Sequence, residues 1–172
     1  TVLAALVAAT ISNTDALKVV TSGADSQAEA EAVEAGIAAN PTTGTADQLA
    51  AIVQGVGVAG GITDVNAATF VASLNDNSVT GTANTAKFAV AGAVSDAQVK
   101  SVKAGITVGG HTAAQLRTLV TASVIEANAV RVVTADADND TEAQAVVNGI
   151  GVVGSTQAQL NVLVTAPVAP AN

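Results

Sequence analysis

The chain has 172 residues and a net charge of −8 at neutral pH, with six Lys and Arg residues in total, no Cys, Met, Trp or Tyr, and two Phe. This composition lacks the basic patches and stacking aromatic side chains that nucleic-acid binding requires, excludes disulfides and cysteine-ligated metals, and gives a surface that an anionic membrane would repel. Hydrophobic residues make up 49% of the chain but aromatic residues only 1%, so the core has to be built from small aliphatic side chains and closely approaching backbones.

The first segment, residues 1–10, is predicted to form an N-terminal helix that caps the rest of the chain. Its apolar run over residues 2–9 is far shorter than the roughly 20 residues that a membrane-spanning helix needs, so we expect no membrane span. Because residue 1 is Thr and not Met, we expect the chain to be processed or to be part of a longer protein.

An internal repeat runs through residues 11–164, in three approximate copies over residues 11–53, 54–120 and 121–164. Each copy contains a segment of one type, namely Thr45-Ala-Asp-Gln-Leu, Thr112-Ala-Ala-Gln-Leu or Thr156-Gln-Ala-Gln-Leu. Gly61, Gly105 and Gly149 lie 44 residues apart, whereas Leu49 and Leu116 lie 67 residues apart. The second interval exceeds the first by 23 residues, which is about half a repeat. This excess indicates a unit of about 22 residues, with one extra half-unit near residues 63–81.

Each unit is predicted to contain one short strand and one helix. Valine-rich patches favour strands; they are Lys18-Val-Val-Thr, Phe88-Ala-Val and Arg131-Val-Val-Thr. Two pairs, Ser95 with Gln98 and Thr112 with Gln115, have the spacing of a capping box at the start of a helix. Glycines at positions 36, 105 and 149 stand where such helices are expected to stop.

A strand and a helix in about 22 residues is the size of a unit in an α/β solenoid, where parallel strands joined by right-handed crossovers form a narrow sheet beside a layer of helices. We therefore predict the α/β class, as a solenoid-like stack of short strand–helix units. The alternative is an all-α array of short helices in which the valine patches are also helical, since the chain is rich in alanine and alanine favours helix.

The repeats resemble those of long secreted surface proteins of cyanobacteria and other aquatic bacteria. The resemblance lies in a Val/Thr patch followed by a segment such as Ser95-Asp-Ala-Gln-Val and then one such as Thr112-Ala-Ala-Gln-Leu, and it covers most of residues 11–164. It implies a surface-layer or adhesin-like protein, of a kind often accompanied by haemolysin-type calcium-binding repeats. The Gly-Gly-x-Gly-x-Asp motif of those calcium-binding repeats does not occur in this sequence.

The best candidate for a binding site is the acidic segment that contains Asp136, Asp138, Asp140 and Glu142. Alternating carboxylates are typical of calcium loops, because Ca²⁺ takes several oxygen ligands from one loop. A second interpretation is an acidic loop in which Asp140 caps the next helix. Asn75-Asp76-Asn77 is a weaker calcium candidate of the same kind. No other cofactor is predicted.

Nothing in the sequence predicts catalysis. His111, the only histidine, follows two glycines in a predicted loop, and a lone histidine there is usually solvated. The Gly-x-Gly-x-x-Gly spacing of residues 55–60 follows a predicted helix and not the strand that a dinucleotide site requires. The tail, residues 165–172, contains two prolines and is predicted to be a linker.

These features predict a non-catalytic structural subunit or segment of an extracellular or cell-surface assembly, such as a surface layer, sheath, filament or matrix. Its predicted partners are copies of itself or neighbouring segments of a longer chain, because the ends of a repeat array are open. The alternative function is an adhesin-type binding module for glycan or protein.

Overall fold

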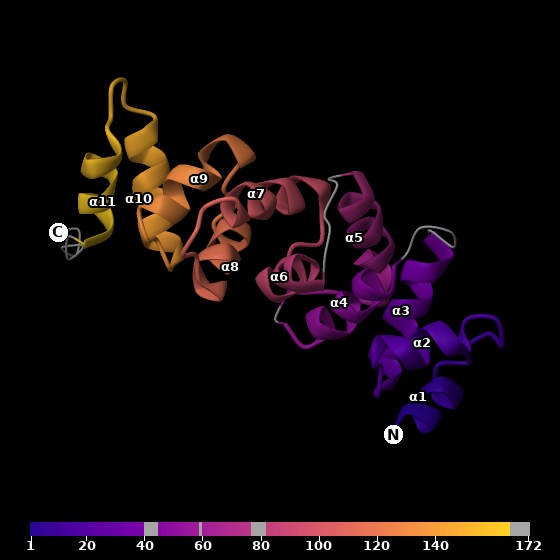
Figure 1. The fold of residues 1–172 in the computed structure, drawn as a ribbon. Helices are drawn as coiled ribbons and strands as arrows, with labels where there is room; N and C mark the ends of the chain where they lie inside the picture. The colour runs from indigo at the N-terminus through magenta and orange to yellow at the C-terminus, as the bar shows by residue number, and fades with distance from the viewer. Residues whose placement is uncertain (40–44, 59, 77–81, 166–172) are drawn as a thin grey trace.

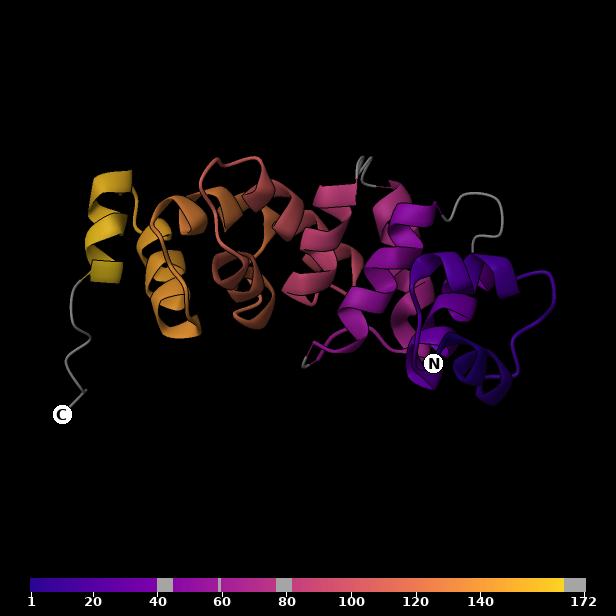
Figure 2. The same cartoon turned by 60° about the horizontal axis from the view of Figure 1, so that its bottom comes forward.

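The protein is an elongated array of short α-helices in the computed structural model, which describes residues 1–39, 45–58, 60–76 and 82–165. In chain order the helices are α1 (Val2–Ala8), α2 (Ala16–Ser22), α3 (Gln27–Ala39), α4 (Ala46–Val56), α5 (Asp64–Asp76), α6 (Thr82–Ala91), α7 (Asp96–Ile106), α8 (Ala113–Thr121), α9 (Glu126–Thr134), α10 (Asp140–Ile150) and α11 (Gln157–Thr165). They follow one another along the long axis, with α1 near one end and α11 at the other (Figures 1 and 2).

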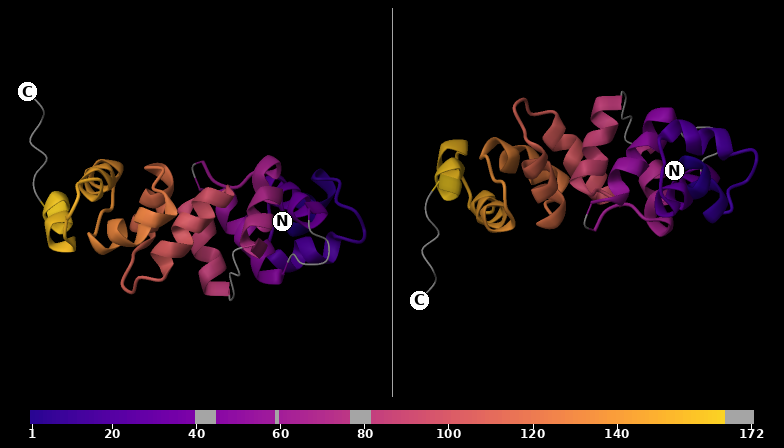
Figure 3. Two further views of the ribbon diagram at one scale, coloured as in Figure 1. Left: turned by 90° about the horizontal axis from the view of Figure 1, so that it is seen from above. Right: turned by 90° about the horizontal axis from the view of Figure 1, so that it is seen from below.

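The helices lie in two interleaved rows. Most helices pack on their neighbour in the chain, and each also packs on the next helix but one: α1, α3, α5, α7, α9 and α11 form one row, and α2, α4, α6, α8 and α10 form the other. The views from above and below in Figure 3 show the same progression along the array. Every inner helix therefore depends on neighbours from before and after it in the chain to bury its apolar side.

The predicted α/β class is wrong, and the all-α alternative describes the molecule. The described residues form eleven helices and contain no strand. The valine-rich patches are parts of α2, α6 and α9. In α9 the buried residues Ala129, Val132 and Val133 recur at helical spacing, and this burial outweighs the weak strand preference of valine.

The threonine that ends each of two valine patches is also accommodated in a helix. Thr21 Oγ1 donates to the Leu17 carbonyl oxygen at 2.9 Å, and Thr134 Oγ1 donates to the Val130 carbonyl oxygen at 2.7 Å. Each hydroxyl thus bonds to the carbonyl four residues earlier, as threonine commonly does within helices. A sequence preference for strand is therefore offset by local hydrogen bonds as well as by burial.

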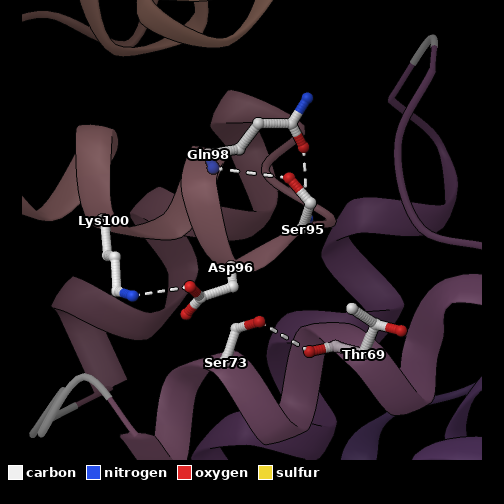
Figure 4. Close-up of polar contacts among 6 residues, drawn as sticks. All are labelled: Thr69, Ser73, Ser95, Asp96, Gln98 and Lys100. Atoms are coloured by element: carbon white, nitrogen blue, oxygen red, sulfur yellow. Dashed lines mark hydrogen bonds and ion pairs between the residues drawn. The ribbon is translucent and has the colours of Figure 1, made fainter. Parts of the chain in front are cut away.

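The two predicted capping boxes are confirmed, and they belong to a wider pattern. Ser95 accepts a hydrogen bond from the Gln98 amide at 3.4 Å while the Ser95 amide donates to Gln98 Oε1 at 3.1 Å (Figure 4). Thr112 and Gln115 make the same reciprocal pair at the start of α8. Further capping pairs of this kind open α3, α4 and α11, at Ser26 with Glu29, Thr45 with Gln48 and Thr156 with Gln159.

Four of the capped helices carry a glycine ten residues after the cap residue. Ser26, Thr45, Ser95 and Asn139 precede α3, α4, α7 and α10, and Gly36, Gly55, Gly105 and Gly149 follow at that distance. The prediction that these glycines stop their helices fails at Gly36, which lies inside α3, whereas Gly105 and Gly149 are the second-last residues of α7 and α10. Each makes room for a close approach: a Cβ at position 36 would stand 2.6 Å from Ile52 Cδ1 of α4.

Gly61 is not a structural counterpart of Gly105 and Gly149, despite its 44-residue spacing from Gly105. It lies between α4 and α5, where a Cβ would stand 2.4 Å from the carbonyl oxygen of Gly55. The extra half-unit predicted near residues 63–81 coincides in part with α5. The predicted boundaries of the repeats and of the terminal segments remain predictions. In the part of the chain that the structure describes, no helix has both the length and the apolarity to cross a bilayer.

Candidate functional site

The acidic segment lies at the junction between α9 and α10, and its backbone is shaped by helix capping. Asp136 has a left-handed φ of 64°. Its amide donates to the Val133 carbonyl, and the Ala137 amide donates to the Val132 carbonyl, which is the hydrogen-bond pattern of a Schellman motif. Gly23 and Gly92 are left-handed at the ends of α2 and α6, so Asp136 holds a position that glycine occupies in the related helices.

The four carboxylates of this segment turn to separate partners. Asp136 Oδ1 accepts from Gln115 Nε2 at 3.2 Å, and Asp140 Oδ1 accepts from Thr121 Oγ1 at 2.5 Å. Asp138 Oδ1 accepts from Asn139 Nδ2 at 3.2 Å. Glu142 Oε2 accepts from the Asp138 amide at 3.1 Å. The carboxylates therefore tie α9 and α10 back to α8 and to their own helix start.

Asp140 does not cap α10, contrary to the second interpretation of this segment. The N-cap is Asn139, whose side chain accepts from the Glu142 amide at 3.1 Å. Asp140 is the first residue of the helix, where its charge lies near the positive end of the helix dipole. The interpretation from sequence assigned the N-cap one residue too late, because Asn and Asp are equally good N-cap residues.

Among the described residues, no three His, Cys, Asp or Glu side chains are grouped as metal ligands. The calcium loop at Asp136, Asp138, Asp140 and Glu142 stays a prediction, and binding there would require these carboxylates to turn toward a common point. Of the weaker candidate at residues 75–77, Asn77 and the side chains of Asn75 and Asp76 lie outside the described part of the structure.

His111 is held by its own turn. Its Nδ1 donates to the Val108 carbonyl oxygen at 2.7 Å, and the side chain is half-buried. The ring lines a groove of about 470 Å³ between α6 and α8, together with Lys87 and the apolar side chains of Val90 and Leu116. The groove is mainly apolar, with His111 and Lys87 as its ionisable groups.

A second groove, of about 420 Å³, lies between α7 and the turn that joins α8 to α9. Lys100 and Glu126 border it, and Leu119 and Ile125 contribute apolar surface. Lys100 Nζ is also paired with Asp96 Oδ2 at 2.6 Å in the same helix (Figure 4). Both grooves are shallow surface features that could accommodate an extended ligand or a side chain of a partner.

Polar side chains that the sequence analysis did not single out connect the helices of the C-terminal half. Arg131 Nη2 donates to the Ser155 carbonyl oxygen at 2.7 Å, and Gln157 Nε2 donates to the Arg131 carbonyl oxygen at 3.1 Å. Gln144 Nε2 donates to the Ala122 carbonyl oxygen at 2.8 Å. The available signal was the recurrence of a basic residue at positions 18, 87 and 131, but only the packing shows which carbonyl Arg131 reaches.

Comparisons of the chain with protein-family models, with curated proteins and with solved structures found no match.

Proposed function

We propose that this chain is a non-catalytic structural segment that assembles with copies of itself, or with neighbouring segments of the same kind, outside the cell. The observation that carries the proposal is a group of exposed valines on the last helix that the structure describes and on the turn before it. Val152, Val153 and Val162 there are 64%, 101% and 60% exposed. Clustered apolar side chains on a surface usually mark an interaction site.

The way the array is stabilised supports this proposal. Inner helices bury alanine, valine and leucine on helices before and after them, whereas the last helices have a neighbour on one side alone among the described residues. In a repeat array such an end is normally covered by a polar capping repeat. The valines at this end are therefore suited to further packing on a similar unit.

Composition supports a location outside the cell or at its surface. The chain has no Cys and no Met, so it offers none of the side chains that oxidants attack most readily. Its net charge of −8 keeps the surface well solvated. The resemblance to secreted bacterial surface proteins points in the same direction, and a surface layer, sheath, filament or matrix would suit such a segment.

The experiment that tests the proposal is negative-stain electron microscopy of the purified 172-residue chain, combined with light scattering over a concentration series. We expect ordered particles larger than one chain, as rows, fibres or sheets. A chain that stays monomeric at about 1 mM, where even weak specific contacts are occupied, would contradict the proposal.

The two grooves beside α8 favour a second function, that of an adhesin-type binding module. They hold about 470 and 420 Å³ and combine apolar lining with Lys87 and His111 in one case and Lys100 and Glu126 in the other. A glycan-array screen tests this alternative. Binding that Lys87→Ala weakens while the protein remains folded would support it, and an array without hits would count against glycan as the ligand.

A further inference from the structure

The last pair of helices lacks a contact that earlier pairs have. At Gly36 of α3, a Cβ would meet Leu49 and Ile52 of α4 and, at 3.3 Å, Val71 Cγ2 of α5. At Gly105 of α7, a Cβ would meet Leu116 and Leu119 of α8 and, at 3.2 Å, Val133 Cγ2 of α9. In both cases a valine from the helix after the pair completes the packing over the glycine.

At Gly149 of α10 the packing is incomplete. A Cβ there would meet Leu160 and Leu163 of α11, and no third side chain of the described residues lies within 4 Å. Instead, a hollow of about 270 Å³ opens beside Gly149, lined also by Val152 and Val153. The hollow is thus the place that a following helix would fill with a valine.

Helix α1 carries a valine in the matching register. Both α1 and α8 end with a left-handed residue, Thr10 at φ 55° and Ser123 at φ 53°. The next amide in each case donates five residues back, to the carbonyl of Leu6 in α1 and of Leu119 in α8. This shared ending aligns α1 with α8, so that Val7 corresponds to Val120.

The same register relates α1 to α5, which follows a helix pair in the array. Val120 stands eight residues after the cap residue Thr112, and Val71 stands eight residues after Thr63, whose amide donates to the Asn66 side chain at 2.7 Å. Val7 of α1 is therefore the counterpart of Val71. Val71 is fully buried over Gly36, whereas Val7 is 82% exposed.

We propose that two copies of this chain associate head to tail, with α1 of one copy packed on α10 and α11 of the other in the way that α5 packs on α3 and α4. Val7 then enters the hollow beside Gly149. The alternation of the two rows is kept, because α1 continues the row of α10 and α2 continues the row of α11. This inference rests on the proposed function and names its partner and its contact surface.

The test uses two variants of the tag-free 172-residue chain. Val7→Asp places a charge on α1, the head of the chain, and Val153→Asp places one at the rim of the hollow beside Gly149, the tail. Both valines are exposed, Val153 at 101%, so neither change should alter folding. Val65→Asp is the matched control, because Val65 is 84% exposed at the start of α5 and lies at neither end. Circular dichroism and the unfolding midpoint verify that all three fold like the wild type.

Sedimentation equilibrium from about 10 µM to about 1 mM measures the association at about 0.15 M salt, where the repulsion between acidic chains is screened. We expect the wild type and Val65→Asp to form a concentration-dependent series of oligomers. Val7→Asp and Val153→Asp should each associate at least about tenfold more weakly, because either change buries an unpaired charge. In an equimolar mixture, the intact C-terminal hollow of Val7→Asp can bind the intact α1 of Val153→Asp, so the mixture should form a dimer. No larger oligomer should form, because both remaining ends of that dimer carry a substitution.

The outcomes separate this inference from the proposed function. If the wild type assembles and both end variants assemble equally well, or if their mixture forms no dimer, the head-to-tail contact is wrong while self-assembly stands. If the wild type remains monomeric throughout, both the contact and the proposed function are wrong, and the C-terminal face belongs to another segment or partner.

Discussion

Gly105 of α7 lies directly beneath Leu119 of α8: a Cβ at position 105 would stand 2.6 Å from Leu119 Cδ1. The missing side chain lets the two helices approach closely enough for Leu119 to be buried to 1% exposure. In a chain with almost no aromatic residues, such close approaches take the place of large side chains in filling the core.

Gly105→Ala is therefore expected to lower the free energy of unfolding by about 1–3 kcal/mol, because overpacking forces the leucine or the helix to shift. In an exposed helix the same change would stabilise by about 1 kcal/mol. Urea denaturation measures the difference. Gly109→Ala is the control, because nothing lies within 4 Å of a Cβ there; equal effects at both positions would show that the close approach does not matter.

Ser101 of α7 is fully buried, and its Oγ has no hydrogen-bond partner. The positions that correspond to it in α3 and α4 are alanines, Ala32 and Ala51. Ser101→Ala is expected to raise the free energy of unfolding by about 1 kcal/mol, since an unsatisfied buried hydroxyl is costly. Ser73→Ala is the comparison, because Ser73 Oγ donates to the Thr69 carbonyl at 2.8 Å (Figure 4), and its loss should not stabilise. A Ser101→Ala variant no more stable than the wild type would indicate that the hydroxyl is satisfied.

The reciprocal pair of Ser95 and Gln98 begins α7. Ser95→Ala is expected to cost about 1 kcal/mol of stability, because the Gln98 amide loses its acceptor. Ser95→Thr should retain most of the stability, since threonine fills the same role at Thr45 and Thr112. Thermal unfolding followed by circular dichroism distinguishes the two variants, and similar losses for both would argue against a capping effect.

Glu29 makes the start of α3 sensitive to acid. Partial burial raises the pKa of Glu29, but hydrogen bonds from the Asp25 and Ser26 amides, at 2.8 and 3.1 Å, outweigh it and leave the pKa below its ordinary value of 4.5. A carboxyl group with a lowered pKa stabilises the folded state above the unfolded-state value, and this contribution is lost as the pH falls through the lower folded-state value. The loss is thus expected below about pH 4.5.

Glu29→Gln tests this dependence, since glutamine occupies the same capping position in α4, α7 and α8. The variant should remain capped, and its unfolding midpoint should fall less than that of the wild type between neutral pH and about pH 3, near the ordinary range for carboxyl groups. Identical pH profiles for the two proteins would contradict the role assigned to Glu29.

The acidic segment between α9 and α10 offers a direct test of the predicted calcium loop. Because Asp136, Asp140 and Glu142 each accept a hydrogen bond from a different partner, we expect calorimetric titration with Ca²⁺ up to about 1 mM, the range of weak extracellular modules, to produce no binding heat. Heat that Asp138→Asn removes would instead show that the segment rearranges around the ion, and would establish the site.

The sequence by itself determined the local features of this protein. Ser95 with Gln98 and Thr112 with Gln115 were identifiable as helix starts, because a capping box is made by residues three apart and needs no distant partner. The recurrence of similar segments pointed to an array of units that cannot bury their apolar sides alone. These features depend on neighbouring residues in the chain, so they can be recognised before the fold is known.

Only the tertiary structure decided the conformation of the valine patches and the role of the glycines. Val132 and Val133 fit a strand by preference, but their burial against other helices makes the helix the better solution. Gly105 lies near the end of α7, as its sequence pattern predicts, but its role there is to leave room for Leu119 of α8, which lies 2.6 Å from the position of a Cβ. Which side chain covers a residue depends on segments far away in the chain, and local sequence patterns carry no information about that contact.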